Sequence, residues 1–428
     1  MTEALIFFGV SPTGNSTICK SDGTLAGTGP IIDTELGVNI GGELDMPGPV
    51  LLDYGNAILA RGMNNGENVL WFYNKGAHTY TPFDFEPTNT GTTFNPQGFV
   101  LYKGLIYFNG YVFGQAAPDL FVTDGNAGGT QQITTSSLNP SSLAVAYNKL
   151  FFSGNSASGP ILYSYDGSSS QPAPVGVNVA NPSSLTVAFV GTSFVLPDPD
   201  LPFFHPPQPP LFMSGQDSSG TWLFKYDDSS LTKIAPTTAP SSGLAPYNLV
   251  NLGWVQTRRV GPFNLESWHR ALCFLGSSAS GGQEVWISLG TSDSTNQIPM
   301  PFVSNQYHPF NLTPFNGMLY FTAYDSAPPA PEGGRGLFVY DPVANHTRQI
   351  IMSSAYNLDP GNFQPGWFAM SQYTMAVFNN KLYFNATKKN DISPILWCID
   401  GAPTSGQATP QAVGGRQPFS LTTANPAP

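Results

Sequence analysis

The sequence has little charge and no long apolar run. Charged residues make up 10% of its 428 positions, against roughly a quarter in a typical soluble protein. Lys and Arg together number 16, and the net charge is −11. Because nucleic-acid binding needs clustered positive charge, no nucleic-acid partner is expected. No stretch of about 18 apolar residues occurs, so no membrane span is expected either.

Cysteine is scarce, and the first residues do not resemble a secretion signal. Cys19, Cys273 and Cys398 are too few and too scattered for a disulfide framework or a zinc site, so we expect buried strand thiols. The opening MTEALIFFGV lacks the basic region and the long apolar core of a signal peptide. We expect a soluble protein that does not use the Sec route.

Glycine (45), proline (40) and aromatic residues (13%) are abundant, which favours an all-β protein. The stretch 102–130 shows how they are arranged. It predicts a strand at 105–108, a Gly-rich connection, and a second strand at 120–122 that ends in the turn pair Asp124-Gly125. Such a two-stranded unit cannot bury its apolar face alone and is stable only beside copies of itself.

Eight such units occur, with a mean period of about 53 residues, near the 40 to 50 typical of propeller blades. The first of the two strands in each unit falls at 5–8, 56–60, 105–108, 147–154, 211–215, 271–275, 315–323 and 378–386. The sequence therefore predicts one all-β domain over 1–428, an eight-bladed β-propeller, with seven blades as the alternative. Insertions are expected at about 191–210 and 255–270.

A proline precedes an apolar strand ahead of most units, a position that suits a residue with fixed φ and no amide donor. One copy, Gln417 to Leu421, lies near the C-terminal end with no unit after it, whereas the first unit has no leading strand. We therefore expect the segment Pro418–Thr422 to pair with Leu5–Phe8. Such pairing closes the ring and leaves no exposed sheet edge.

Two segments, Lys20 to Thr28 and Asp119 to Thr130, read KSDGTLAGT and DLFVTDGNAGGT. They resemble the Glu-Leu-Trp…Asp-Gly-Thr…Gly-Thr repeats of β-propeller modules in large bacterial and other surface proteins. The resemblance implies a propeller whose first blade is completed by the C-terminal strand. It implies little about activity, because the repeat is a structural signature.

Catalytic and metal sites find little support in the sequence. The Asp residues that end the units are better explained by turn geometry than by metal binding or acid catalysis. The histidines lack metal-ligand spacing, and no cofactor is expected. Acids outside the turns, such as Glu266 and Glu284, are sparse for a glycoside hydrolase, which needs paired carboxylates.

Polar residues that precede the prolines are candidates for a ligand site at one mouth of the central channel, where amide and imidazole groups suit sugar hydroxyls. The competing explanation is that such residues favour the turn before proline. The candidates are Asn95, Asn139, Asn181, His308, Gln364 and Gln417.

The two insertions interrupt the same connection of adjacent units, so we expect them to emerge side by side and to bind a partner. Aromatic residues beside arginine are typical of interface hot spots. The candidates are Phe203, Phe204, Arg258, Arg259 and Trp268. We expect a non-enzymatic structural or interaction protein that binds other subunits of a virion or an extracellular or cell-surface assembly. A carbohydrate-binding propeller with glycan ligands, a glycoside hydrolase and a cytoplasmic location remain alternatives.

Overall fold

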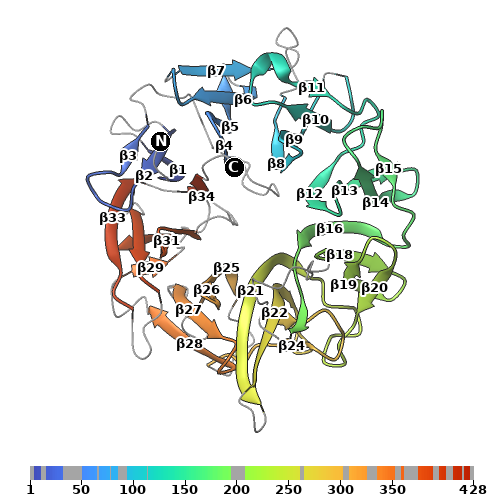
Figure 1. Cartoon of the computed structure of the whole chain (residues 1–428), viewed down its shortest axis with the longest axis vertical. Helices are drawn as coiled ribbons and strands as arrows, with labels where there is room; N and C mark the ends of the chain where they lie inside the picture. The colour runs from blue at the N-terminus through green and yellow to red at the C-terminus, as the bar shows by residue number, and fades with distance from the viewer. Residues whose placement is uncertain are drawn as a thin grey trace.

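The computed structural model describes residues 4–10, 16–31, 51–64, 67–77, 79–84, 94–112, 114–193, 208–260, 265–301, 308–324, 335–351, 358–360, 375–388, 395–401, 408–416 and 419–424. Their strands form eight antiparallel sheets, which stand like blades around a central axis (Figure 1). The protein is an eight-bladed β-propeller, as the sequence predicts, and the seven-blade alternative is wrong.

Each blade has four main strands, from the first, nearest the axis, to the fourth, at the rim. Blade 1 contains β34 (Phe419–Ala424), β1 (Ala4–Val10), β2 (Ser16–Ser21) and β3 (Gly29–Pro30). Blade 2 contains β4 (Leu51–Tyr54), β5 (Ala57–Asn64), β6 (Glu67–Asn74) and β7 (Thr79–Phe83). Blade 3 contains β8 (Gln97–Tyr102), β9 (Leu105–Gly110), β10 (Asp119–Thr123), the 3₁₀ turn η1 (Ala127–Gly129) and β11 (Gln131–Gln132). Blade 4 contains β12 (Ser141–Ala146), β13 (Lys149–Ser156), β14 (Gly159–Tyr165) and β15 (Ala173–Pro174).

The other four blades follow the same order, and two of them have an additional strand. Blade 5 contains β16 (Ala180–Val187), β18 (Leu211–Asp217), β19 (Gly220–Tyr226) and β20 (Leu231–Ile234). Blade 6 contains β21 (Tyr247–Val260), β22 (Leu265–Ser277), β23 (Gln283–Ser288) and β24 (Thr295–Gln297), with β17 (Gly191–Ser193) added to β22. Blade 7 contains β25 (Phe310–Phe315), β26 (Met318–Tyr324), β27 (Arg335–Asp341) and β28 (His346–Ile351). Blade 8 contains β30 (Met375–Phe378), β31 (Lys381–Lys388), β32 (Ile395–Ile399) and β33 (Gln411–Arg416), with β29 (Leu358–Pro360) also on β31.

The first strands share one irregularity. In β8 the register shifts between Gln97, opposite Asn109, and Val100, opposite Tyr107, so three steps along β8 match two along β9. The same one-residue bulge occurs in β12, β16, β21, β25 and β34. A bulge bends the strand and increases its twist. These six described strands are therefore shaped alike at the same level of the ring.

The bulge has a sequence signal, a proline followed two positions later by Gly, Ser or Asn and then by Leu or Phe. The small or polar residue is left-handed in five of these strands, with φ between +50° and +66° at Gly98, Ser142, Ser184, Asn248 and Asn311. A β-branched residue is strained at such φ values, whereas glycine and short polar residues tolerate them better. The signal thus encodes backbone geometry.

The turns from third to fourth strands are held by paired hydroxyl groups. In blade 1, Ser21 Oγ lies 2.6 Å from Thr28 Oγ1 and accepts the amide of Gly23. Thr123 with Thr130, and Ser288 with Thr295, repeat this arrangement at 2.9 and 2.7 Å. Because Gly23 and Gly125 have φ values of +95° and +89° and face Tyr383 and Tyr54 of the preceding blades, a side chain at either would be strained and would clash.

Tyrosines at the ends of first strands connect neighbouring blades. Tyr54 donates its hydroxyl to the carbonyl oxygen of Gly104 in the next blade. Tyr102 does the same to Asn148 at 2.7 Å, and Tyr147 to Tyr226 at 3.1 Å. The connection therefore passes from blade 2 to blade 5 through equivalent residues.

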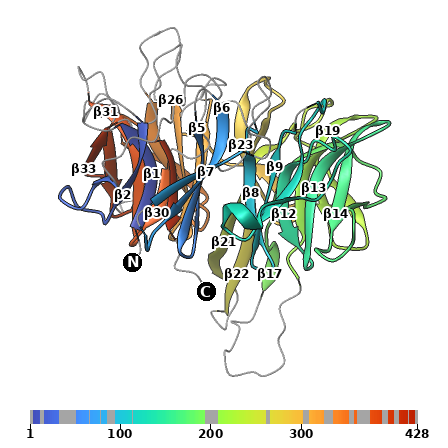
Figure 2. The same ribbon diagram turned by 90° about the horizontal axis from the view of Figure 1, so that it is seen from above.

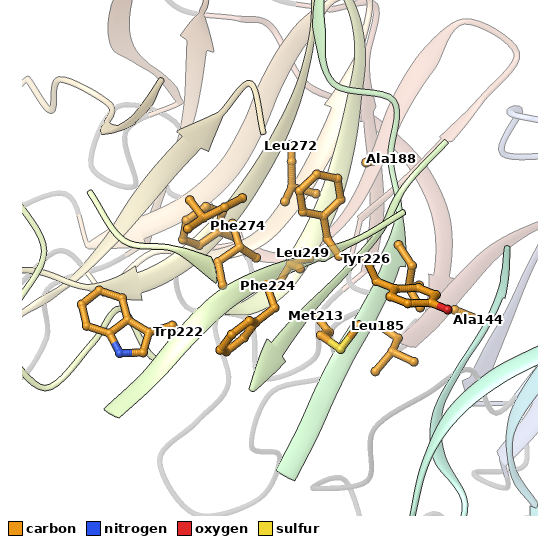
Figure 3. Packing of buried hydrophobic residues seen from close by; sticks show 14 of the residues in the cluster. Ala144, Leu185, Ala188, Met213, Trp222, Phe224, Tyr226, Leu249, Leu272 and Phe274 are labelled. Carbon is orange, nitrogen blue, oxygen red and sulfur yellow. The ribbon is translucent and has the colours of Figure 1, made fainter. Parts of the chain in front are cut away.

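The core consists of apolar side chains packed between blades. Ala144 of blade 4, Met213 and Phe224 of blade 5, and Leu272 and Phe274 of blade 6 belong to one buried cluster (Figure 3). Further clusters join blades 6 and 7, 7 and 8, 8 and 1, 1 and 2, 2 and 3, and 3 and 4. Full burial of a large apolar side chain contributes about 1.5–3 kcal/mol, so each blade is stabilised chiefly by its neighbours.

Blade 1 combines strands from both ends of the described chain. β34 pairs antiparallel with β1, with Thr423 opposite Leu5, Thr422 opposite Ile6 and Phe419 opposite Phe8. Leu5 and Phe7 of β1 also pack with Phe378 and Leu396 of blade 8. Both backbone pairing and side-chain packing therefore hold blade 1 in the ring.

We predict that truncation after Gln417, which removes β34, lowers the melting temperature by several degrees, because it exposes the edge of β1 and removes the six-residue pairing. Truncation after Ala424 keeps β34 and serves as the control. Differential scanning calorimetry measures both. Equal melting of the two truncated proteins would show that β34 contributes nothing to stability.

A second prediction concerns the bulge. Asn248→Val places a β-branched residue at a φ of +50° and is expected to lower the free energy of unfolding by about 1–2 kcal/mol. Asn248→Gly, which tolerates this φ, is expected to cost about 0.5 kcal/mol or less. Urea denaturation compares the two. A larger loss for glycine than for valine would contradict the backbone explanation.

Candidate functional site: the arm face

The feature that breaks the symmetry of the ring is a long hairpin. β21 has 14 residues and β22 has 13, whereas no other described strand exceeds eight. β22 pairs with β23 only from Leu272 to Ser277. The part beyond, residues 254–260 of β21 and 265–270 of β22, projects from one face of the ring (Figure 2). We call this part the arm and the face that bears it the arm face.

The base of the arm is widened by blade 5. β17 pairs with β22 through Gly191 opposite Arg270, Thr192 opposite His269, and Ser193 opposite Trp268. The prediction that the two insertions lie side by side is confirmed for these residues. Phe203 and Phe204, the proposed apolar anchor, lie outside the described residues. The second insertion, at 255–270, continues two strands of blade 6, since the antiparallel pairing of β21 with β22 extends through its described residues.

The arm carries most of its charge as arginine. Residues 258–270 contain Arg258, Arg259 and Arg270 and one acid, Glu266, so a 13-residue segment holds three of the 16 Lys and Arg residues. Arg258 and Arg259 occupy a register shift between Thr257 and Val260. The Arg270 guanidinium lies 4.2 Å from the centre of the Phe189 ring, a cation–π contact at the base of the arm.

The arm face also holds the exposed large apolar residues of the described chain. Leu25 is 70% exposed, Val343 50% and Leu101 44%. Leu25 and Val343 lie in turns between third and fourth strands, and Leu101 lies one residue before the end of a first strand. Because strands alternate in direction, all three positions lie on the face from which the arm projects.

Aspartates in the turns from third to fourth strands surround this face. Asp166 accepts the amides of Ser168 and Ser169, both at 2.8 Å. Asp22, Asp124, Asp227 and Asp341 bond to amides two or three residues ahead in the same way. The predicted turn role is confirmed for these five residues. Hydrogen bonds from the Thr24 hydroxyl and amide favour the charged form of Asp22 and lower its pKa.

Three lysines on the same face have local partners. Lys149 pairs with Asp228 at 3.2 Å, and Lys381 pairs with Asp400 at 2.8 Å. Lys103 donates to the carbonyl oxygen of Asp166 at 2.8 Å. No ion pair to Asp22, Asp124, Asp227 or Asp341 is found within the described residues, so these four charges are available to a partner.

The residues proposed for the channel mouth are distributed one to a blade. Asn95, Asn139, Asn181 and His308 are left-handed, with φ between +42° and +51°, a conformation in which Asn and His are enriched. Asn95 accepts from Arg61 at 3.3 Å, and Asn181 donates to Gln216 at 2.8 Å. These contacts support the turn explanation and do not bring the four together. Gln364 and Gln417 lie outside the described residues.

Two acids outside the turns are partly or fully buried. Asp119 is fully buried and accepts hydrogen bonds from Thr134 Oγ1 at 2.8 Å and from the Leu138 amide at 3.1 Å, which ties the connection to blade 4 onto β10. Glu284 is the second residue of β23, opposite Gly276, and desolvation raises its pKa to about 7. The sequence alone does not show that Asp119 and Glu284 are buried, because burial depends on the neighbouring blades.

Other sites can be assessed only for the described residues. No group of three or more His, Cys, Asp or Glu side chains there could hold a metal ion. The three cysteines are buried, as predicted, and burial raises the pKa of Cys19 to about 12. In the same part of the chain no helix is long and apolar enough to cross a membrane.

No protein-family model and no curated protein matches this sequence. Among solved structures, the chain is similar to the β-propeller domain of the trilobed protease from Pyrococcus furiosus, with 11% identity, a TM-score of 0.42, and coverage of 86% of this chain and 96% of that one. It is also similar to TolB from Acinetobacter baumannii, with 10% identity, a TM-score of 0.34, and coverage of 87% of this chain and 81% of TolB. A third similar structure is the GH74 enzyme of Niastella koreensis, with 11% identity and a TM-score of 0.48. The match covers 87% of this chain and 54% of that enzyme. These similarities concern the fold and assign no activity.

The raised pKa of Glu284 gives a prediction with a defined sign. Between about pH 4.5 and pH 7 the folded protein keeps a proton that the unfolded chain has lost, so stability falls as pH rises through this window. Glu284→Gln removes the effect. We expect the mutant to be more stable than the wild type by about 1 kcal/mol at pH 8 and nearly equal to it at pH 4. Urea denaturation at both pH values measures this, and the same difference at both would contradict it.

Proposed function

We propose that the chain is a non-enzymatic interaction propeller that binds a protein partner on its arm face. The observation that carries the proposal is the arm, a strand pair that extends past its blade where no blade packing requires it. Figure 2 shows it beyond the body of the ring. Because ordering such a segment costs conformational entropy, its retention points to a contact outside the propeller.

The composition of the face supports the same proposal. Leu25, Leu101 and Val343, on three different blades, expose apolar area there that a partner would cover. Arginine on the arm adds a residue favoured at interface hot spots. A place in a virion or in an extracellular or cell-surface assembly suits the low charge and is part of the proposal.

The alternatives have less support in the geometry. A carbohydrate site at the channel mouth needs free amides, whereas Asn95 and Asn181 already bond to Arg61 and Gln216. A glycoside hydrolase needs two facing carboxylates, whereas the turn aspartates cap turns and Asp119 is enclosed by hydrogen bonds. Glycan arrays and a panel of glycoside substrates test these alternatives directly.

The proposal predicts where a partner is cross-linked. Photo-cross-linking residues placed at Leu25, Leu101 and Val343 are expected to form adducts with the partner in the native assembly. The same groups at Asn139, Asn181 and Ser241, exposed residues outside the arm face, serve as the control. Mass spectrometry identifies the adducts.

Removal of the arm is the second part of this test. Replacing residues 255–269 by Asn-Gly joins Trp254 to Arg270 by a two-residue turn and is expected to abolish the adducts while the ring stays folded. Adducts at the control positions instead, or adducts unchanged without the arm, would refute the proposal.

A further inference from the structure

We propose that the arm face binds a second copy of this chain, the basic arm of each copy lying against the acidic turns of the other in a two-fold symmetric dimer. This inference rests on the proposed function and names the partner of the same surface. It is drawn from charge, from the placement of that charge on one face, and from the shape of the arm.

The arm has an excess of arginine over acid, and aspartates without an ion pair in the described part of the chain lie in turns of its own face. The arm contains three arginines, Arg258, Arg259 and Arg270, and one acid, Glu266, whereas the whole chain has a net charge of −11. Asp22, Asp124, Asp227 and Asp341 project their turns from the same face and form no ion pair among the described residues. Complementary charge of this kind directs which surfaces associate.

Placement on a single face makes the surface complementary to itself. In a two-fold interface the same patch is used by both subunits, so a contact from one side is repeated from the other. An arm with positive charge beside turns with negative charge meets this condition, since rotation brings each arm onto the partner's turns. The exposed residues Leu25, Leu101 and Val343 of both copies would lose contact with water in the same interface.

The backbone of the arm leads away from its own ring. β21 and β22 stay paired from Trp254 to Val260 and are held at the base by β17. The arm therefore extends roughly 20 Å beyond the last β22–β23 pair, at about 3.4 Å per residue. The backbone of positions 258 and 259 lies near the far end of the described arm.

Addition of a strand from another protein to the free edge of β21 is the competing explanation. The register shift at Arg258 and Arg259 argues against it, because bulges and charged residues are the usual means by which exposed edges avoid pairing. The arm is better suited to bind through its charge than through its backbone.

Sedimentation velocity of the full chain tests the inference over a range of concentration and salt. The wild type is expected to dimerise, and the dimer to weaken as salt rises. Arg258→Glu with Arg259→Glu is expected to weaken dimerisation by at least about tenfold. Replacing Asn139, Asn181, Thr238 and Ser241, exposed residues outside the arm face, by Asp changes the net charge equally, leaves the arm intact, and is expected to keep the dimer. Melting temperature and circular dichroism confirm that each variant is folded.

A separate variant tests the turn aspartates that would bind the partner's arm. Replacing Asp22, Asp124, Asp227 and Asp341 by Asn keeps an acceptor oxygen for each turn amide and removes the charge. It is expected to weaken the dimer with the arm unchanged. A wild type that stays monomeric at every concentration, or a dimer unaffected by either set of substitutions, would overturn the inference. If cross-links to a different protein still formed on the arm face, the proposed function would stand and only the second copy would be wrong.

Discussion

The structure depends on burial between blades. A single four-stranded sheet has two apolar faces and cannot cover either with its own residues, so each blade is stable only between two others. The buried clusters that join neighbouring blades run around the ring, from Ala144 and Met213 on one side to Leu5 and Phe378 where blades 8 and 1 meet. This requirement explains why β34 and β1 share a blade: an unpaired edge there would leave two apolar faces incompletely covered.

The repeated polar residues serve this architecture before any ligand. Asn and His before the prolines occupy left-handed positions, the Gly, Ser or Asn two residues after the proline occupies the bulge, and the turn aspartates hold amides. Repetition itself is the physical clue, because a site for one ligand needs different groups converging on one place, whereas a turn needs the same group in every blade. Function is better sought where the repeat is broken.

The arm is such a break. Blades 2, 3, 4, 7 and 8 turn from first to second strand through two residues, whereas β21 and β22 of blade 6 continue past the ring and contain arginines. This extension lies beyond the last β22–β23 pair and is therefore not part of the four-stranded pattern of the blades. It lies on the face that also exposes Leu25, Leu101 and Val343, and the proposed protein interface rests on this combination.

The sequence by itself determined the period, the strand pairs of each unit, the eight blades and the turn role of the aspartates. These features are local: alternating apolar residues, Asp-Gly pairs and prolines act over a few positions. Only the tertiary structure decided the rest. Residues 255–270 continue two strands, and β17 joins another blade. Asp119 is enclosed, Glu284 is desolvated, and charges from distant turns share a face with the arm. All of these features depend on which segments become neighbours. Local sequence cannot encode such distances, because they arise only when the ring brings separate blades together.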